Sequence, residues 1–476
     1  MPSLLHTPHK KHPKSARHIA LNAWMKFDTG LYDQQPSTVE ALLLGEADYQ
    51  QLSPSDQGFA RAMLLFAMRH YGQLEKLILL QFDKKPAAKL WRKLSPFLML
   101  GAAQMIIMKL PAHAVCNEMT ALVKKFKLVG LDRLANRILR KIAAHGAADL
   151  PDPIHNLPAF FQTMIAQNYG AEINPQLALA LLEPPPLDLS FKSAAARDEF
   201  IKISTAQAMK YDMIKLGNQL RLMPAPAAVT ALPLFHQDAW WVQDFAAQLP
   251  IACLESKEIN HKRTLDMCAA PGGKSLQLAS LGAQVTAIDI SNARLKRLNE
   301  NRKRLCFQAN IAIKQANMLT LDLDALNGDQ GDSGFDLIIL DAPCSASGTV
   351  RRNPEILRKF TNPDDYQHQL DQLIAMQRAL ALKAQSLLNP HGILLYIVCS
   401  LDVQEGEAQC QHIINHPDIY HLQPSTLITD QRLETLENIA KTAPISFSNL
   451  EAGASLRLLP HDGMDGFFFA KFTKIG

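Results

Sequence analysis

Hydrophobic positions in the first third of the chain recur three or four residues apart. The pattern fills the stretches 16–25, 56–78, 114–126 and 131–144. This spacing is typical of helices that bury one face and expose the other. We therefore expect residues 1–148 to form an all-α domain.

Residues 149–235 have a different character, because prolines cluster there. The run Pro184-Pro185-Pro186 cannot lie inside a helix or a central strand. It marks a connection before a strand predicted at residues 187–192. We expect a small α/β connecting subdomain, and its sequence suggests no catalytic or ligand-binding residues.

From residue 236 onward, continuous apolar runs alternate with helix-like stretches. Strands are predicted at residues 264–270, 284–290, 310–315, 335–342, 392–400, 455–460 and 466–473. Buried strands that alternate with helices predict a mostly parallel, doubly wound, Rossmann-like sheet. We expect residues 236–476 to form this domain and its ligands to bind beyond the carboxyl ends of the strands.

Charge is distributed unevenly along the chain. Residues 1–150 hold 21 Lys and Arg against 11 Asp and Glu, a net charge of +10, whereas the rest hold 28 against 34, a net charge of −6. The last predicted helix of the first domain carries a basic row, Arg133, Arg137, Arg140 and Lys141. The asymmetry indicates a polyanionic partner, and an ordinary solvated surface is the alternative.

The composition favours a cytoplasmic protein with no membrane partner. The most apolar stretch, residues 97–108, is shorter than the roughly 20 residues that a membrane span needs. The first residues lack the apolar core of a secretory signal. Seven cysteines without CxxC spacing fit a reducing compartment.

A glycine-containing turn follows the strand predicted at residues 264–270. The turn reads APGGK, residues 270–274, and its glycines would let the backbone approach a ligand closely. Asp289 ends the next strand, where a carboxylate can hold both hydroxyls of a ribose. The pair favours an adenosine-bearing cofactor without a pyrophosphate, and S-adenosylmethionine is the leading candidate. The alternative role for Asp289 is an N-cap for the helix that opens near Ser291.

Two cysteines are predicted at the ends of neighbouring strands. Cys344 follows Asp341 in the sequence DAPC, and Cys399 ends the strand at 392–400. Such a pair suits methylation at C5 of a pyrimidine, because addition of a thiolate to C6 makes C5 nucleophilic. One cysteine would then attack and the other would assist release of the product. Asp341 would hydrogen-bond the edge of a cytosine and support protonation at N3.

Four motifs closely resemble those of the Sun/Nop2 family of RNA cytosine-5 methyltransferases. They are LDMCAAPGGKS, AIDIS, LDAPCSASGTVRRNPE and YIVCSLDVQEGE, and WWVQDFAAQLP at 240–250 resembles that family's entry into its catalytic domain. The basic helical region with CNEMTALVKKFK is similar to a NusB-type RNA-binding domain. The resemblance covers nearly the whole chain.

The resemblance also implies site roles. Cys399 matches the nucleophile, Cys344 the cysteine that assists release, and Lys274 a lysine near the active site; Asp341 acts with them. The implied cofactor-binding residues are Cys268, Ala269, Ala270, Pro271, Gly272, Gly273, Lys274, Asp289, Asn317 and Asp341. The chain departs from the family pattern at Asn317, where an acidic residue is usual, and at Gly406, where the usual pair is Glu-Asn.

Other candidates carry less weight. Cys410, His412 and His416 have a spacing that could recruit a metal, but a surface helix end is the favoured interpretation, and we expect no metal. His6, His9, His12 and His18 are assigned to a flexible basic arm. Arg351 and Arg352 could clamp phosphates around an extruded nucleotide, or be ordinary exposed charges.

The resemblance implies an S-adenosylmethionine-dependent RNA cytosine-5 methyltransferase acting on small-subunit (16S) ribosomal RNA, either free or in an early assembly intermediate. The rival hypotheses are the same chemistry on transfer RNA and a non-catalytic RNA-binding assembly factor.

Overall fold

The computed structural model describes residues 15–32, 38–226, 228–321, 334–442 and 453–476. The chain divides into two compact units, one of Met1–Phe161 with Asn353–Thr361 and the other of Gln162–Arg352 with Asn362–Gly476. The three-part division at residues 148 and 235 remains a prediction.

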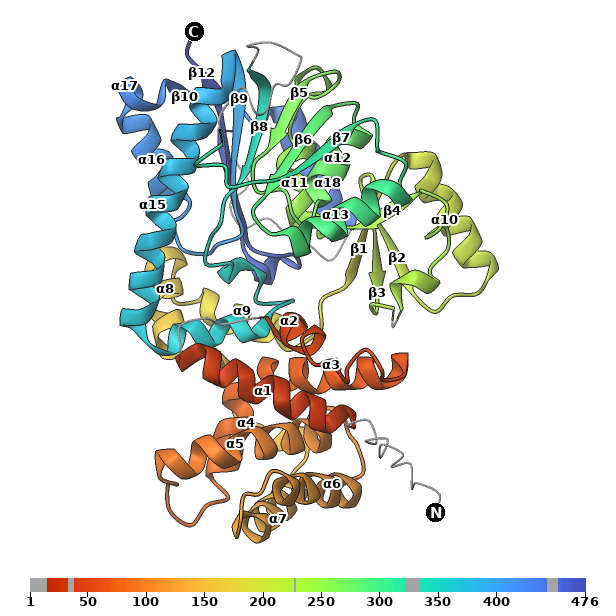
Figure 1. Ribbon diagram of the computed structural model, residues 1–476, viewed down its shortest axis with the longest axis vertical. Coiled ribbons are helices and arrows are strands. Elements are labelled where there is room, and N and C mark those ends of the chain that lie inside the picture. Colours follow the sequence, from red (N-terminus) through yellow and green to blue (C-terminus); the bar gives the residue numbers. More distant parts are fainter. Residues whose placement is uncertain (1–14, 33–37, 227, 322–333, 443–452) are drawn as a thin grey trace, which may run out of the picture. The chain divides into compact units, whose positions relative to one another are not determined.

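The first unit is helical, as the sequence predicts. Its main helices are α1 (Ala16–Tyr32), α2 (Val39–Leu44), α3 (Pro54–Arg69), α4 (Tyr71–Leu79), α5 (Ala88–Ala102), α6 (Ala112–Lys125) and α7 (Leu131–Ile142) (Figure 1). The stretch 56–78 forms two helices because His70, with φ −101° and ψ 22°, leaves the helical conformation. The assignment of His18 to a flexible arm is wrong, since His18 is buried in α1 with its ring 4.9 Å from that of Phe126. His6, His9 and His12 lie outside the described residues.

A short segment from much later in the chain belongs to this helical unit. The segment Pro354–Thr361 forms 3-10 turns, and the Glu355 carboxylate accepts a hydrogen bond from the Val39 amide at 3.2 Å. The Phe360 ring packs edge-on against Phe161 at 4.7 Å. Because these contacts join residues that are far apart in the sequence, no local sequence pattern predicts them.

The second unit contains a small antiparallel sheet in the order β2-β3-β1-β4. Its strands are β1 (Leu187–Phe191), β2 (Asp212–Leu216), β3 (Gln219–Met223) and β4 (Trp240–Val242), with α10 (Ala194–Ala206) beside them. The buried Asp188 carboxylate receives two 2.8 Å hydrogen bonds from Arg221, which compensate the desolvation of both charges. Asp188 also accepts the Phe245 amide at 3.0 Å, which ties this sheet to α11 (Phe245–Ala252).

The large sheet has the order β10-β12-β9-β8-β5-β6-β7, with β11 paired to β12 (Figure 1). The strands are β5 (Arg263–Asp266), β6 (Gln284–Asp289), β7 (Ile311–Gln315), β8 (Phe335–Asp341), β9 (Leu388–Val398), β10 (Leu422–Pro424), β11 (Ser455–Leu458) and β12 (Phe467–Lys474). Strands β5 to β9 pair in parallel and β12 runs antiparallel to β9. The prediction of a mostly parallel Rossmann-like sheet is confirmed.

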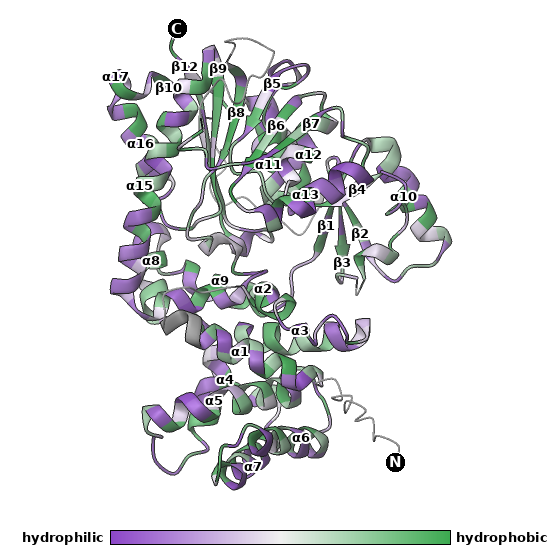
Figure 2. Cartoon of the chain, viewed as in Figure 1, coloured by the Kyte–Doolittle hydropathy of each residue, from purple (hydrophilic) through white to green (hydrophobic). Residues whose placement is uncertain are grey.

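Both faces of this sheet are buried, since successive side chains of a strand point to opposite sides. In β8, Leu337 and Ile339 join one core, while Ile338 and Leu340 join the other. The first core includes side chains of α11, α12 (Gly273–Ser280), α13 (Asn292–Arg304) and α18 (Asp430–Thr442), and the second those of α15 (Pro363–Leu387), α16 (Glu407–Asn415) and α17 (Pro417–Tyr420). Figure 2 shows β8 and β9 as largely hydrophobic and α13 as largely hydrophilic.

Candidate active site

The carboxyl ends of β5, β6, β8 and β9 meet at one edge of the sheet, over a cavity of about 730 Å³. Ten of the eleven predicted site residues other than Cys399 line this cavity together with Cys399, so the fold brings together residues that are far apart in the sequence. The predicted site residues that line the cavity are Cys268, Ala269, Ala270, Pro271, Gly273, Lys274, Asp289, Asn317, Asp341, Cys344 and Cys399. Gly272 is the predicted residue that does not line it.

Gly272 nevertheless shapes the cavity wall. Its φ of +108° lies in the left-handed region that glycine adopts readily. A Cβ atom at this position would lie 2.2 Å from the Leu298 side chain. Glycine therefore allows the turn after β5 to pass close to α13 and to deliver the N-terminus of α12 to the cavity.

Asp289 is buried at the end of β6 and fixes the turn after β5. One carboxylate oxygen accepts the Ala270 amide at 3.1 Å, and the other accepts the Ser291 amide at 2.8 Å and Arg294 at 2.9 Å. The N-cap of α13 is Ser291, whose hydroxyl accepts the Arg294 amide. The alternative N-cap role thus belongs to Ser291, while Asp289 lies on the cavity wall.

Two carboxylates near the cavity have different surroundings. Lys274 donates to Asp341 at 2.8 Å, and its ammonium lies 5.4 Å from the centre of the Phe467 ring. Asp266, at the end of β5, is fully buried and accepts a 2.6 Å hydrogen bond from Ser275. Burial raises the pKa of Asp266 to about 7.

The two thiols lie side by side. The Sγ atoms of Cys344 and Cys399 are 3.4 Å apart, and both side chains are partly exposed to the cavity. The hydrogen bond to Cys399 and burial raise the pKa of Cys344 well above its ordinary value. Either sulfur atom can donate the hydrogen bond between the two cysteines.

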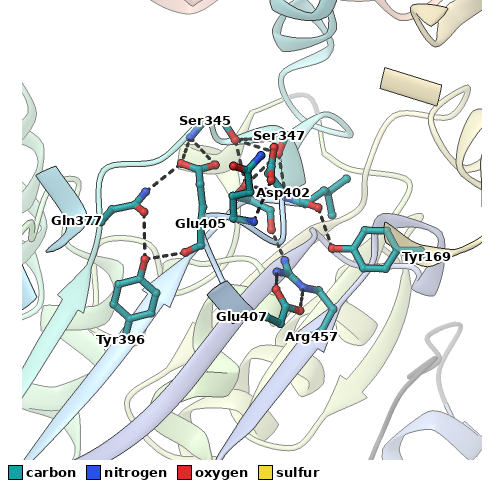
Figure 3. Close-up of polar contacts among 12 residues, drawn as sticks. Tyr169, Ser345, Ser347, Gln377, Tyr396, Asp402, Glu405, Glu407 and Arg457 are labelled. Carbon is teal, nitrogen blue, oxygen red and sulfur yellow. Dashed lines mark hydrogen bonds and ion pairs between the residues drawn. The ribbon is translucent and has the colours of Figure 1, made fainter. Parts of the chain in front are cut away.

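A buried polar network holds the loops that carry these thiols (Figure 3). Glu405 accepts the Ser345 amide at 2.9 and 3.2 Å and Gln377 at 2.9 Å. The hydroxyl groups of Ser345 and Ser400 are 3.0 Å apart, and each of these serines directly follows one of the cysteines. The network therefore fixes the spacing of the two sulfur atoms.

The departure at Gly406 has a structural explanation. A Cβ atom on Gly406 would lie 2.4 Å from the guanidinium of Arg457 and 2.9 Å from the Phe468 ring. Arg457 donates to the Ser400 carbonyl and forms a 2.5 Å ion pair with Glu407 (Figure 3). Since Arg457 fills the space beside residue 406, an asparagine there would not fit without rearrangement.

Several residues at the site are not identified by sequence reasoning. The cavity is also lined by Gln243, Asp244, Thr349, Met376 and Phe467, and Arg352, one of the two arginines that the sequence suggested as phosphate contacts, lines it as well. Asp244 caps α11 by accepting the Ala246 amide at 2.9 Å, and an Asp directly before an apolar run is a sequence signal of a helix start that could have identified it. Asp465 pairs with Arg352 at 2.5 Å, and no local pattern marks it.

Other candidate features lie away from the cavity. Cys410 is buried in α16, whereas His412 and His416 lie at the end of that helix with their rings tilted and the ring centres 4.4 Å apart. Within the described ranges, no group of three or more His, Cys, Asp or Glu side chains could hold a metal ion. Among the described helices, none is long and apolar enough to cross a membrane.

Fold and site together define a Rossmann-like methyltransferase with a thiol pair beside its ligand turn. Comparison with known families agrees: residues 252–473 match the family described as 16S rRNA methyltransferase RsmB/F, and residues 14–144 match the NusB family. Residues 252–473 are thus similar to a methyltransferase family and residues 14–144 to a family of helical domains.

Relatives and solved structures extend this result along the chain. Ribosomal RNA small subunit methyltransferase B of Pasteurella multocida is 29% identical over 423 residues, 84% of each chain, and that of Shewanella oneidensis is 28% identical over 446 residues, 91% of this chain and 94% of the relative. The crystal structure of PH0851 has a TM-score of 0.69 at 18% identity, covering 98% of this chain and 100% of that one. NSun6 from Pyrococcus horikoshii with SFG has a TM-score of 0.52 at 18% identity over 67% and 98% of the two chains. The last two comparisons establish the fold.

Proposed function

We propose that this methyltransferase methylates C5 of a cytosine in 16S ribosomal RNA, with S-adenosylmethionine as methyl donor and through a covalent bond between Cys399 and C6. The observation that carries the proposal is the thiol pair, 3.4 Å apart in the cavity that also contains the Lys274–Asp341 pair. Methylation at carbon, unlike methylation at nitrogen or oxygen, needs such a nucleophile because C5 is too poor in electrons to react unaided.

The cavity suits an adenosine-bearing methyl donor. Asp289, Asn317 and the turn residues 268–271 all line the cavity. With the donor bound, the Asp289 carboxylate would receive ribose hydroxyl groups and Asn317 the adenine amino group. Bound there, S-adenosylmethionine would supply an electrophilic methyl group. The N-terminus of α12 gives the same wall a favourable potential for a carboxylate.

The residues of the chain then act in a defined order. The Cys399 thiolate forms a bond to C6 and breaks the C5–C6 double bond, while Asp341 holds the cytosine edge and supports protonation at N3. C5 would then take the methyl group, whose bond to the sulfonium sulfur of the donor breaks to leave a neutral thioether, and the C5 proton would pass to solvent water. The electron pair from that C–H bond restores the C5–C6 double bond, the S–C6 bond breaks, and the thiolate returns to Cys399. Cys344 assists this release.

Ribosomal RNA is supported as the substrate by the family description and by the names of the relatives. Arg133, Arg137, Arg140 and Lys141 are all exposed on α7, as contacts to RNA phosphates require. The target base must be unpaired or flipped out of its stack to reach the thiols. The same chemistry on transfer RNA is the second candidate.

The direct test uses 16S RNA transcribed with tritium at C5 of cytidine. Methylation at C5 displaces that hydrogen, so each methyl group transferred should release one tritium into water, and bisulfite sequencing should then locate the methylated position. Methyl transfer without tritium release would mean another atom is the target. RNA binding without transfer, with S-adenosylmethionine present, would favour the non-catalytic assembly factor. Faster transfer to unmodified transfer RNA would reverse the choice of substrate.

A further inference from the structure

The two thiols of the cavity form a close sulfur–sulfur pair between distant parts of the chain. All seven cysteines are free thiols, and Cys344 and Cys399, 55 residues apart in the sequence, have their Sγ atoms 3.4 Å apart. A disulfide bond is about 2.05 Å long. The two sulfur atoms therefore need to approach each other by only about 1.3 Å to become bonded.

The backbones that carry the two cysteines leave the sheet side by side. Both cysteines lie just beyond the carboxyl ends of the paired parallel strands β8 and β9, in which Asp341 lies opposite Ile397. The Ala342 amide donates to the Ile397 carbonyl at 2.8 Å, so the pairing continues past the end of β8. Neighbouring strands lie about 4.8 Å apart, and the Cα atoms of disulfide-bonded cysteines are usually about 4.4–6.8 Å apart. The sheet thus starts both loops at a separation within the disulfide range.

Hydrogen bonds beyond the strands keep the two loops together. The Gly348 amide donates to the Cys399 carbonyl at 3.0 Å, and the hydroxyl groups of Ser345 and Ser400 are 3.0 Å apart. The Glu405 carboxylate accepts the Ser345 amide at 2.9 Å (Figure 3). Because these contacts lie within the chain and involve residues next to the cysteines, they hold the thiol pair at close range without RNA or cofactor.

A small oxidant can reach the pair through the cavity. Both cysteines are partly exposed and line a space of about 730 Å³. A water molecule takes about 30 Å³ in the liquid, and hydrogen peroxide has only one oxygen atom more. The exposed Cys306, just after α13, is open to the same oxidant and provides an internal control.

We propose that Cys344 and Cys399 are an oxidation site: a hydroperoxide converts them to a disulfide, and the disulfide switches methyl transfer off until a thiol reductant restores the two cysteines. The formation of the disulfide is independent of the proposed function, whereas the loss of activity rests on the roles proposed there for the two cysteines. In a reducing compartment, such a disulfide would be transient and would report a rise in oxidant.

The reaction has two steps, and its product is the same whichever sulfur atom reacts first. One sulfur atom attacks an oxygen of hydrogen peroxide, the O–O bond breaks, and a sulfenic acid and one water molecule form. The second sulfur atom then attacks the sulfenic sulfur, the S–O bond breaks, and the hydroxyl group leaves as water with the proton of the second thiol. The two thiols lose two electrons and two protons, which reduce the peroxide to two water molecules. Because the second sulfur atom is already in contact, we expect this step to outrun oxidation to a sulfinic acid.

Peptide mass spectrometry of the full-length protein tests the proposal. The reduced protein is treated with hydrogen peroxide, its remaining thiols are blocked with N-ethylmaleimide, and it is digested. The expected product is a cross-linked pair of peptides that contain Cys344 and Cys399. Methyl transfer should be lost in proportion to this cross-link, and dithiothreitol should restore both thiols and the activity. Cys306→Ser is the matched control and should show the same cross-link, the same loss and the same recovery.

The Cys344→Ala variant shows whether the second thiol makes the oxidation reversible. Its covalent RNA complex should no longer form after prolonged peroxide treatment, and dithiothreitol should not restore it, because Cys399 is then oxidised beyond the sulfenic acid. The wild type should recover from the same treatment. Absence of the cross-link from a wild-type protein that Cys399→Ala inactivates would overturn the inference and leave the proposed function intact. A complete cross-link with methyl transfer at its full rate would overturn the switch and the covalent mechanism together.

Discussion

Cys344 and Cys399 show how the surroundings of a residue decide its chemistry. Their sulfur atoms are 3.4 Å apart, and the hydrogen bond to Cys399 together with burial raises the pKa of Cys344 well above its ordinary value. The same principle applies to the aspartates at the ends of neighbouring strands. Asp289 accepts three hydrogen bonds, while Asp266 accepts one from Ser275 and its second oxygen has no hydrogen-bond partner among the residues that the structure describes.

Asp289→Ala should raise the dissociation constant for S-adenosylmethionine about tenfold or more, because a charge-assisted hydrogen bond to the ribose would be lost. Calorimetry measures this directly. Ser291→Ala is the matched control, since it removes the N-cap of α13 and should leave affinity almost unchanged. Wild-type affinity in Asp289→Ala would leave Asp289 with only the structural role of holding the turn after β5.

Asp266 should make the stability of the protein depend on pH. The pKa of Asp266 is about 7 in the folded state and 3.8 ordinarily. Between these two pH values, the Asp266 carboxyl group is protonated in the folded state and ionised in the unfolded state. Stability should therefore fall as pH rises through this window, by up to about 1.4 kcal/mol per pH unit. Asp266→Asn should remove this fall.

Urea denaturation of the cofactor-free protein at the two ends of that window measures the effect. The free energy of unfolding of Asp266→Asn, relative to the wild type, should be higher at the upper end than at the lower end. Equal differences at both ends would show that Asp266 titrates normally.

At the scale of elements, the site depends on close backbone packing between loops that follow different strands. Gly348 and Gly466 touch each other beside the Cys399 carbonyl, while Glu405, Ser345 and Ser400 connect the two thiol loops. Parallel strands bring their carboxyl ends together, but these contacts set the spacing at the level of single atoms. The antiparallel β12 contributes because its beginning lies at the same edge.

Gly348→Ala should destabilise the second unit by about 1–3 kcal/mol, as overpacking does, and should reduce methyl transfer because the Cys399 carbonyl must move. Gly58→Ala in α3 is the control: apart from the neighbouring residues and the backbone of its own helix, no atom of the described residues lies within 4 Å of its Cβ position. That change should stabilise the first unit by about 0.5–1 kcal/mol through helix propensity. Urea denaturation and a methylation assay measure both variants. Equal effects of the two substitutions on stability and on methyl transfer would show that the contact between Gly348 and Gly466 does not support the site.

At the scale of the whole molecule, a basic helical domain and a catalytic domain share one chain. The helical domain carries the net positive charge, and the exposed residues of α7 concentrate it. Phosphate contacts from such a surface give affinity without sequence recognition, so choice of the target base falls to the catalytic cavity.

The triple variant Arg133→Gln, Arg137→Gln and Arg140→Gln should weaken RNA binding at low salt. The slope of log affinity against log salt should become shallower by roughly 2 to 3, because about that many counterions are no longer released. Replacing Lys202, Lys210 and Lys257, which are exposed elsewhere, by glutamine should change the slope less. An unchanged slope in the arginine variant would show that α7 does not contact the RNA phosphates.

Much of this organisation follows from sequence patterns of short range. Apolar periodicity predicts the helices of the first unit and the strands from β5 to β9, and the motifs at strand ends single out Asp289, Cys344 and Cys399. Features that depend on tertiary contacts were not predicted: Asp465 beside Arg352, Arg457 beside Gly406, and the packing of Pro354–Thr361 in the helical unit. Their partners are too far away in sequence to leave a local pattern.

The central claim is that Cys399 attacks and Cys344 releases, and a denaturing gel of each variant with RNA and S-adenosylmethionine tests it most directly. In the Cys344→Ala variant, Cys399 should still attack C6 and the methyl group should still be transferred, but the product should not be released. A covalent protein–RNA complex should therefore accumulate as a slower band that nuclease destroys. Cys399→Ala and the double variant should show no such band and no methylation. A trapped band in Cys399→Ala but not in Cys344→Ala would reverse the roles, and full methylation in both single variants would contradict the covalent mechanism.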